Sequence, residues 1–384
     1  HAPPPYLYWR SPENALRVAA GMESSSAPSP GEDWRAWLRD SSVAETSGEV
    51  ARIFTLAFDP GSTQDGPWEQ FPGARIWRPA AMYAAEGDVE AFHGMSAHDV
   101  PAQDDVAEQA SAFPHRGGIH IPARDDAQYR QRVAAGLDLL ADGGLRKIVL
   151  ARSMRVELDT AFDPLRALTS LQQAHTFGIC YSPDGRHYFI SATPERLARV
   201  RAGRFSTMAL AGTLPHRQTG EAGRQELLEN AKERAEHAYV TEMIREALAP
   251  FSAEMEVDDV RLLALPHITH ILTRIEGQLD AGYGMLDVVS ALHPTPAVAG
   301  TPRDAATAGI RALEDFSRGL YAGCIGWVDA AGNGDAAVAI RSAVAHERTA
   351  HAFAGAGIVA GSDPMDEEAE TRAKLQTALD ILGT

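Results

Sequence analysis

Residues 352–376 read AFAGAGIVAGSDPMDEEAETRAKLQ, an apolar run that passes through several glycines into a strongly charged run. The apolar part predicts a strand over 351–359 that ends in a glycine-rich turn containing Gly355, Gly357 and Gly361. Because glycine has no side chain, the backbone of such a turn can approach a ligand closely. This stretch therefore combines a strand, a permissive turn and a charged segment within one short part of the chain.

A helix is predicted directly after the turn, because Asp363 is a favourable N-cap and Pro364 suits the first helical position. At about 100° per residue, Glu367, Glu370 and Lys374 fall within about 60° of one face of this helix. A solvated face crossed by salt bridges is the simpler explanation of such a pattern. The alternative is a site that presents two carboxylates and an ammonium to a ligand, and the rest of the chain decides between the two.

Working outward, the sequence predicts groups of strands joined by hairpins, with helices between the groups. The predicted strands are 51–58, 75–83, 147–158, several within 177–200, 205–210, 267–279, 321–328, 336–344 and 351–359. The predicted helices are 125–140, 163–175, 225–248, 285–292, 301–314 and 363–382. The fold class is therefore α+β, with large, mostly antiparallel sheets flanked by helices. We expect an N-terminal section, 1–120, packed on a main body, 121–384, as one integrated globular unit.

Composition excludes several classes of function. The formal net charge of −17 over 384 residues argues against nucleic acid as a partner, and an anionic substrate would need a locally positive pocket. Cys180 and Cys324 lie in apolar runs and are predicted to be buried, reduced thiols of a cytoplasmic protein. No apolar run reaches transmembrane length, so no membrane association is expected.

The predicted helix 225–248 carries a second acidic face. Glu229, Glu233 and Glu236 share one side of it with Val240 and the apolar residues that follow. Either the acidic half points toward the interior or a cleft, or the helix leaves the core at its N-terminal end and the glutamates are solvated. Carboxylates of this kind suit a hard cation with oxygen ligands, and Mg²⁺ fits better than a soft metal.

Other chemistries are disfavoured by spacing. The glycines at 355–361 give G-x-G-x-x-x-G, which does not match the dinucleotide fingerprint. His267 and His270 stand three apart in a predicted strand, so they should point to opposite faces and make a poor zinc site. No G-x-S-x-G sequence is present to supply a serine nucleophile.

Nine segments, taken together and in order, resemble the chorismate-utilising enzymes, and most closely the isochorismate synthase branch of that family. The segments are KIVLAR (147–152), SATPERL (191–197), LAGT (210–213), ENAKERAEHAYV (229–240), HILTRIEGQL (270–279), LHPTPAVAGTP (292–302), RGLYAGCIGW (318–327), VAIRSA (338–343) and AGAGIVAGSDPMDEEAETRAKL (354–375). The resemblance covers roughly 125–380. It implies extended antiparallel sheets flanked by helices, with the active site in a cleft between them.

The resemblance also implies roles for matched positions. The metal ligands of the family fall on Glu236 and Glu370, with Glu367 close by, and imply Mg²⁺ as the cofactor. The remaining positions would contact the substrate, chorismate: Arg341, Lys374, Gly355, Ala211, Gly212, Thr213, His270, Thr295 and Tyr321. Lys147 would activate water, and Glu195 would protonate the departing hydroxyl.

The implied reaction explains these residue types. Chorismate is a dianion, and its isomerisation adds water at C2 and expels the hydroxyl at C4. A base must take a proton from water and an acid must give one to the leaving oxygen. Lys147 can act as the base only when it is uncharged, and Glu195 can act as the acid only when it is protonated, which a less polar pocket favours.

Within the family, the match favours water over ammonia as the nucleophile. Ammonia-using relatives such as anthranilate synthase typically lack the lysine that falls on Lys147, and Ala211 stands where aminodeoxychorismate synthase has a nucleophilic lysine. No glutamine amidotransferase subunit is therefore expected. Salicylate synthase, which also eliminates pyruvate, is the alternative, followed by an anthranilate-type synthase or a non-catalytic chorismate-binding protein. Either siderophore or menaquinone biosynthesis would suit the product.

Overall fold

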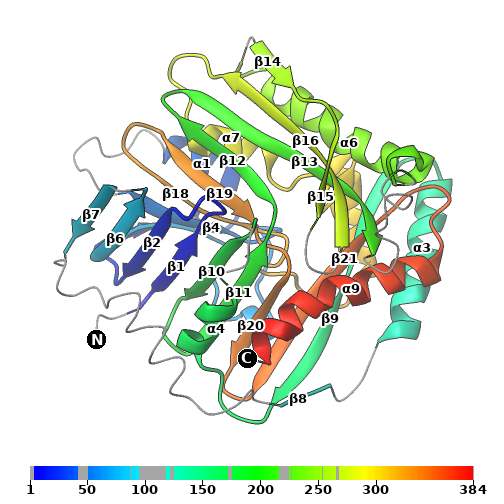
Figure 1. The fold of residues 1–384 in the computed structure, drawn as a ribbon, viewed down its shortest axis with the longest axis horizontal. Coiled ribbons are helices and arrows are strands. Elements are labelled where there is room, and N and C mark those ends of the chain that lie inside the picture. The colour runs from blue at the N-terminus through cyan, green and yellow to red at the C-terminus, as the bar shows by residue number, and fades with distance from the viewer. Residues whose placement is uncertain are drawn as a thin grey trace.

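A computed structural model describes most of the chain and shows two large antiparallel sheets with helices on their outer sides (Figure 1). The described residues are 4–41, 51–87, 89–94, 118–121, 125–171, 175–215, 225, 227–252, 254–264 and 268–383. The α+β class predicted from the sequence, with mostly antiparallel sheets flanked by helices, is confirmed.

The first sheet has eleven strands. Their order is β17 (Gly300–Thr301), β9 (Lys147–Leu158), β21 (Thr349–Ile358), β20 (Ser342–His346), β11 (His187–Thr193), β10 (Phe177–Ser182), β1 (Tyr6–Arg10), β2 (Leu16–Ala20), β6 (Ala81–Glu86) and β7 (Val89–His93), with β8 (Ile119–His120) beside β9. Near one end of this order, β21 pairs with β9 over ten positions, from Thr349 opposite Glu157 to Ile358 opposite Ile148.

The second sheet has ten strands. Their order is β14 (Glu254–Val257), β16 (Ile268–Gln278), β13 (Arg204–Pro215), β12 (Arg196–Arg201), β19 (Gly334–Val338), β18 (Cys324–Val328), β4 (Arg52–Leu56), β5 (Ala74–Arg78) and β3 (Ser24–Ser26), with β15 (Arg261–Ala264) beside β16. Strands that precede residue 121 thus extend both sheets, and the N-terminal section shares their core. Residues 95–117, between β7 and β8, lie outside the described residues.

Helices cover the sheets from outside. They are α1 (Trp34–Asp40), α3 (Asp126–Ala141), α4 (Pro164–Ser170), α6 (Ala231–Leu248), α7 (Met285–Leu292), α8 (Arg303–Leu313) and α9 (Pro364–Leu382), with a 3₁₀ turn η1 (Gly66–Trp68). Helix α9 packs on β21 and α6 packs on β13, so one long helix lies against each sheet (Figure 1). In the part of the chain that the structure describes, no helix is both long and apolar enough to cross a membrane.

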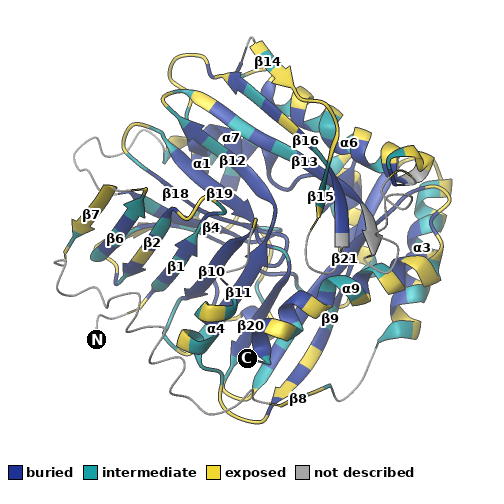
Figure 2. Cartoon of the chain, viewed as in Figure 1, coloured by how far each residue is buried: buried dark blue, intermediate teal, exposed yellow. Residues whose placement is uncertain are grey.

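The core lies between the two sheets, where the strands are almost continuously buried (Figure 2). Aromatic side chains join the layers: Trp77 of the second sheet packs 5.5 Å from Tyr181 of the first, measured between ring centroids. Trp68 packs 5.3 Å from Phe353 of β21 in the same way. Each fully buried aromatic ring contributes a large apolar area, so these contacts hold the sheets face to face.

The chain passes directly between the sheets at several short stretches, and two of these lie beside each other, where β11 leads to β12 and β19 leads to β20. One stretch leaves the eleven-stranded sheet at the end of β11 and enters the ten-stranded sheet as β12, and Glu195 lies between these two strands. The other runs from β19 to β20 in the opposite direction, and Arg341 lies at its passage with φ +52°. The two stretches are neighbours, because β12 pairs with β19 and β11 pairs with β20. Here the prediction of one strand over 336–344 was wrong, since the sheet changes between Val338 and Ser342.

Two other predicted boundaries need correction. Helix α6 begins at Ala231, because the side chain of Asn230 caps it by accepting a hydrogen bond from the backbone N–H of Glu233 at 3.1 Å. Glu229 precedes this cap and is exposed, so it does not share the face of Glu236. On the last strand, Gly355 and Gly357 lie within β21, inside the predicted strand 351–359, and of the three glycines assigned to the turn only Gly361 follows the strand.

Candidate active site

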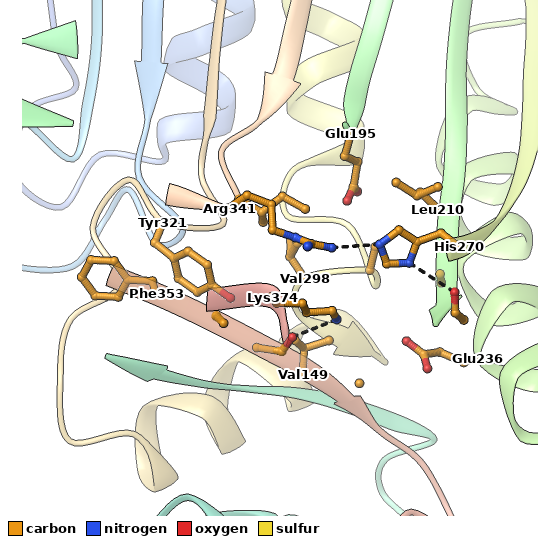
Figure 3. Close-up of a pocket in the computed structure, with 17 residues that line it drawn as sticks. Val149, Glu195, Leu210, Glu236, His270, Val298, Tyr321, Arg341, Phe353 and Lys374 are labelled. Atoms are coloured by element: carbon orange, nitrogen blue, oxygen red, sulfur yellow. Dashed lines mark hydrogen bonds between the residues drawn. The ribbon is translucent and has the colours of Figure 1, made fainter. Parts of the chain in front are cut away.

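A cavity lies beside the place where the β11–β12 and β19–β20 stretches pass between the sheets (Figure 3). Strands of both sheets and the helices α6 and α9 contribute side chains to it. Its lining residues are Val149, Glu195, Leu210, Ala211, Gly212, Glu236, His270, Ala297, Val298, Tyr321, Ile340, Arg341, Phe353, Ala354, Gly355, Gly357 and Lys374. Segments far apart in the sequence therefore meet at one cavity with both charged and apolar walls.

One wall of the cavity is cationic. Arg341 is buried, and its Nη2 donates a hydrogen bond to Nε2 of His270 at 2.9 Å (Figure 3). Burial lowers the pKa of Arg341 to about 10, although Glu370, Tyr321 and Glu195 oppose this shift, so the guanidinium stays charged at neutral pH. Lys374 of α9 donates to the backbone carbonyl of Gly355 at 3.0 Å.

Glu195 faces this cationic wall from the end of the passage between β11 and β12 (Figure 3). Burial raises the pKa of its carboxyl to about 7, while the nearby charges of Lys147, Lys374 and Arg341 act in the opposite direction. Desolvation penalises the charged form of a carboxyl, and here it outweighs three cations. Glu195 is therefore a buried acid that holds its proton up to about neutral pH.

Lys147 and Glu236 form an ion pair at the edge of the cavity. Lys147 begins β9 and is fully buried, and its Nζ donates to Oε1 of Glu236 at 2.9 Å. Gly357 on the adjacent β21 leaves the space for this pair, because a Cβ there would lie 2.3 Å from Oε1 of Glu236 and 2.9 Å from Cε of Lys147. Glu236 lines the cavity, whereas the fully buried Lys147 is not among its lining residues.

Gly212 forms an irregular point in β13. The register of β13 against β16 shifts between Ala211 and Thr213, and Gly212 has φ +82°, a left-handed conformation that glycine adopts without strain. The carbonyl oxygen of Gly212 accepts a hydrogen bond from Nδ1 of His270 at 3.2 Å. Ala211 also lines the cavity, while the side chain of Thr213 lies outside what the structure describes.

The three glutamates assigned to a metal occupy different positions. Glu236 faces the cavity, Glu370 forms a 2.5 Å ion pair with Lys374, and Glu367 is 1% exposed within α9. Among the described residues, no three His, Cys, Asp or Glu side chains gather closely enough to hold a metal ion. The carboxylate chemistry fits a hard divalent cation. Two of the three carboxylates are nevertheless paired with lysines, Glu236 with Lys147 and Glu370 with Lys374.

The structure brings most of the predicted substrate-binding residues to the cavity and adds others. Thr295 is buried and does not line it, although Ala297 and Val298 of the same segment do. Phe353 also lines the cavity and stacks 5.4 Å from the ring of Tyr321. The sequence did not lead us to predict Phe353 as a site residue, although the strand pattern indicates it. Positions 353, 355 and 357 alternate along a strand, so they share one face with the predicted Gly355.

Comparison with known proteins agrees with this geometry. The sequence profile of the chorismate binding enzymes matches residues 5–383. The chain is 34% identical to the salicylate biosynthesis isochorismate synthase of Pseudomonas aeruginosa over 98% of this chain and 85% of that protein. It is 36% identical to the isochorismate synthase DhbC of Bacillus subtilis over 74% of each chain.

A solved structure shows the same fold. The structure titled as a putative 2,3-dihydroxybenzoate-specific isochorismate synthase from Bacillus anthracis superposes with a TM-score of 0.80 at 26% identity, over 99% of this chain and 96% of that one. The chain therefore belongs to the family of chorismate binding enzymes, and the family assignment made from the nine segments is confirmed.

Proposed function

We propose that this protein is an isochorismate synthase, which adds water at C2 of chorismate and releases the hydroxyl at C4. One observation carries the proposal: a buried carboxyl that is protonated up to about pH 7 faces a cationic wall inside one cavity. A dianionic substrate needs the cations, and a leaving hydroxyl needs the acid. The names of the relatives reported above support the same reaction.

Substrate binding is assigned to the cationic wall. Arg341 is a planar, permanently charged donor, and Lys374 is a compact one, so the two suit the two carboxylates of the dianion. Both sit in a space from which much of the solvent is excluded, where charge-assisted hydrogen bonds are stronger than in water. Tyr321 and Phe353 add an apolar surface for the ring of the substrate.

Proton transfer is assigned to Lys147 and Glu195. Lys147, once uncharged, would take a proton from the attacking water at Nζ, and its pairing with Glu236 orients the amine toward the cavity edge. Glu195 would give its proton to the oxygen that leaves C4. An acid whose pKa lies near the working pH is an effective donor, because it is substantially protonated and still gives up its proton readily.

Mg²⁺ is the proposed cofactor. Glu236, Glu370 and Glu367 would hold it, with the ion pairs to Lys147 and Lys374 opening as it binds. The cation would supply positive charge between these carboxylates and a carboxylate of the substrate. The residues of the chain would still orient the substrate and transfer both protons.

The test is to incubate the purified protein with chorismate and Mg²⁺ and to separate isochorismate, salicylate and anthranilate by chromatography. We expect isochorismate, with no anthranilate even when ammonium is added. The Glu195→Gln variant is the matched control, because it keeps the shape of the side chain and cannot donate the proton. Intact chorismate after incubation with the wild-type protein, or anthranilate as the product, would contradict the proposal.

A further inference from the structure

His270 lies between Arg341, which belongs to the cationic wall, and Gly212, where the register of β13 shifts. It comes from β16, is 5% exposed, and lines the cavity (Figure 3). One ring nitrogen, Nε2, lies 2.9 Å from Nη2 of Arg341. The other, Nδ1, lies 3.2 Å from the carbonyl oxygen of Gly212. The imidazole thus bridges two parts of the chain that are separated by about 130 residues.

The two hydrogen bonds determine the tautomer of this ring. A guanidinium has only donors, so Nε2 of His270 must accept the bond from Arg341 and cannot carry a proton. A carbonyl oxygen only accepts, so Nδ1 must be the protonated nitrogen. His270 is therefore neutral with its proton on Nδ1. Burial, followed by the charges of Arg341 and Lys374, lowers the pKa of His270 well below its ordinary value, which agrees with a neutral ring.

A neutral acceptor has a consequence for Arg341 that a carboxylate would not have. His270 accepts a hydrogen bond from Arg341 and so orients the guanidinium, but a neutral ring does not cancel its positive charge. Arginine side chains are commonly oriented by Asp or Glu, which would neutralise the positive charge and repel an incoming anion. Arg341 makes no salt bridge to any carboxylate of the described residues. No carboxylate of the described residues is therefore paired directly with Arg341, and its charge faces the cavity.

We propose that His270 is a positioning residue: as the neutral Nδ1–H tautomer, held by the carbonyl of Gly212, it aims Arg341 at a substrate carboxylate without pairing it with a carboxylate of the protein. This inference rests on the proposed function for the identity of the anion, chorismate. The backbone contributes as well, since Gly212 needs its left-handed conformation to turn the carbonyl toward the ring. A Cβ at Gly212 would lie 2.9 Å from Cδ1 of Ile271.

The test compares three substitutions of His270, with His351→Ala as the control at a partly buried histidine on β21 that lies outside the cavity. His270→Gln offers a neutral acceptor, His270→Ala offers none, and His270→Glu offers a charged one. Chorismate binding is measured by calorimetry, kcat and KM by turnover, and folding by thermal melting. The glutamine and alanine variants isolate the orienting role, because both are uncharged and only glutamine offers an acceptor to Arg341.

For His270→Gln, we expect the Kd for chorismate to stay within about threefold of the wild type, since a neutral acceptor is retained. For His270→Ala, Kd should rise about tenfold with a smaller change in kcat. For His270→Glu, it should rise about a hundredfold, because Arg341 becomes paired before the substrate arrives. Equal Kd values in all variants with unchanged melting, or tighter binding by the glutamate variant, would overturn the proposal.

A second measurement does not depend on the substrate. The ¹⁵N chemical shifts of the imidazole, assigned by comparison with His270→Gln, report which nitrogen carries the proton. We expect the Nδ1–H tautomer, and finding Nε2–H or a charged ring at neutral pH would overturn the proposal. If the wild type has the Nδ1–H tautomer but does not bind chorismate, the proposed function fails while the arrangement around Arg341 stands.

Discussion

Glu195 is the residue at which environment and chemistry are most closely linked. Its carboxyl is buried beside three cations, and burial nevertheless raises its pKa to about 7. In the unfolded chain the same carboxyl has a pKa of about 4.3. The folded protein therefore binds a proton at Glu195 that the unfolded chain releases between about pH 4.3 and pH 7, which links this residue to both stability and activity.

The first prediction is that the free energy of unfolding depends on pH through Glu195. The contribution of Glu195 is fully present below the unfolded pKa and is lost as pH rises through the folded pKa of about 7. Between pH 5 and pH 8, the wild type should lose about 1–3 kcal/mol of stability relative to Glu195→Gln. Denaturant titrations at both pH values measure this difference. The exposed Glu246→Gln is the control, and a pH-independent difference between wild type and Glu195→Gln would contradict the raised pKa.

The second prediction concerns the cationic wall. Arg341→Ala and Lys374→Ala should each weaken chorismate binding roughly ten- to a hundredfold, because each removes a charge-assisted contact of about 1.5–3 kcal/mol. Arg372→Ala on the same helix α9 is the control, since Arg372 is exposed and pairs with Glu368. Calorimetric Kd values for the four proteins give the answer. If Arg341→Ala and Lys374→Ala bind as tightly as Arg372→Ala, the carboxylates bind elsewhere.

The third prediction concerns Lys147. In Lys147→Ala, turnover should be lost while chorismate binding is retained, because this lysine is not among the residues that line the cavity and its proposed role is to activate the water. Turnover and calorimetric binding are measured on the same sample, with melting to verify folding. Near wild-type turnover in the variant would remove Lys147 from the reaction and reopen the choice between water and ammonia.

At the scale of single elements, β21 shows how a missing side chain serves the site. Its Gly357 leaves the volume that the Lys147–Glu236 pair occupies. The fourth prediction is that Gly357→Ala displaces this pair and lowers turnover more than tenfold, since a contact at 2.3 Å forces the carboxylate to move. Gly144→Ala, where a Cβ meets nothing within 4 Å, is the control. Turnover of Gly357→Ala equal to that of Gly144→Ala would refute the argument.

Local patterns in the sequence predicted many of these elements well. The predicted strand 147–158 and helix 285–292 coincide with β9 and α7, because a β-branched run and a capped apolar run are both local signals. The predicted strand 336–344 failed for a physical reason. Its apolar pattern is continuous, whereas the change of sheet after Val338 is imposed by pairing with β12 and then with β11.

Some features of the site could likewise be predicted from local sequence patterns, and others could not. The acidic and basic residues of α9 could be found from helical spacing and family motifs, because both are encoded in consecutive residues. The pairing of Lys147 with Glu236 joins positions 89 residues apart, and no local pattern encodes it. Likewise, the bond between His270 and Arg341 depends on the register of β13 against β16 and on the passage from β19 to β20.

At the scale of the whole molecule, the lysine–glutamate pairs link the proposed metal to the substrate. Lys374 holds Glu370 and Lys147 holds Glu236, so a substrate carboxylate that attracts Lys374 would release Glu370 for the cation. The fifth prediction is that each ligand raises the affinity of the other, by about tenfold, because coupling between two sites is reciprocal. Calorimetric titrations of Mg²⁺ with and without chorismate, in the Glu195→Gln variant to prevent turnover, measure this coupling.

Lys374→Gln provides the matched comparison for this coupling. Because Glu370 then lacks its ammonium partner, Mg²⁺ should bind more tightly without substrate, and chorismate should enhance that binding less than in the parent protein. Equal Mg²⁺ affinity with and without chorismate in the parent protein would show that the ion pairs do not link the two sites.

The long pairing of β9 with β21 also limits how fast the molecule can fold. Ile148 lies opposite Ile358, so the strands that carry Lys147 and Gly357 must find each other across more than half of the chain. Folding slows as the average separation of contacting residues grows, since loop closure precedes the contacts that reward it. During synthesis, the edge of β9 should therefore stay open until residues 349–358 arrive. Newly made chains would carry much of their secondary structure for some time before they can bind any anion.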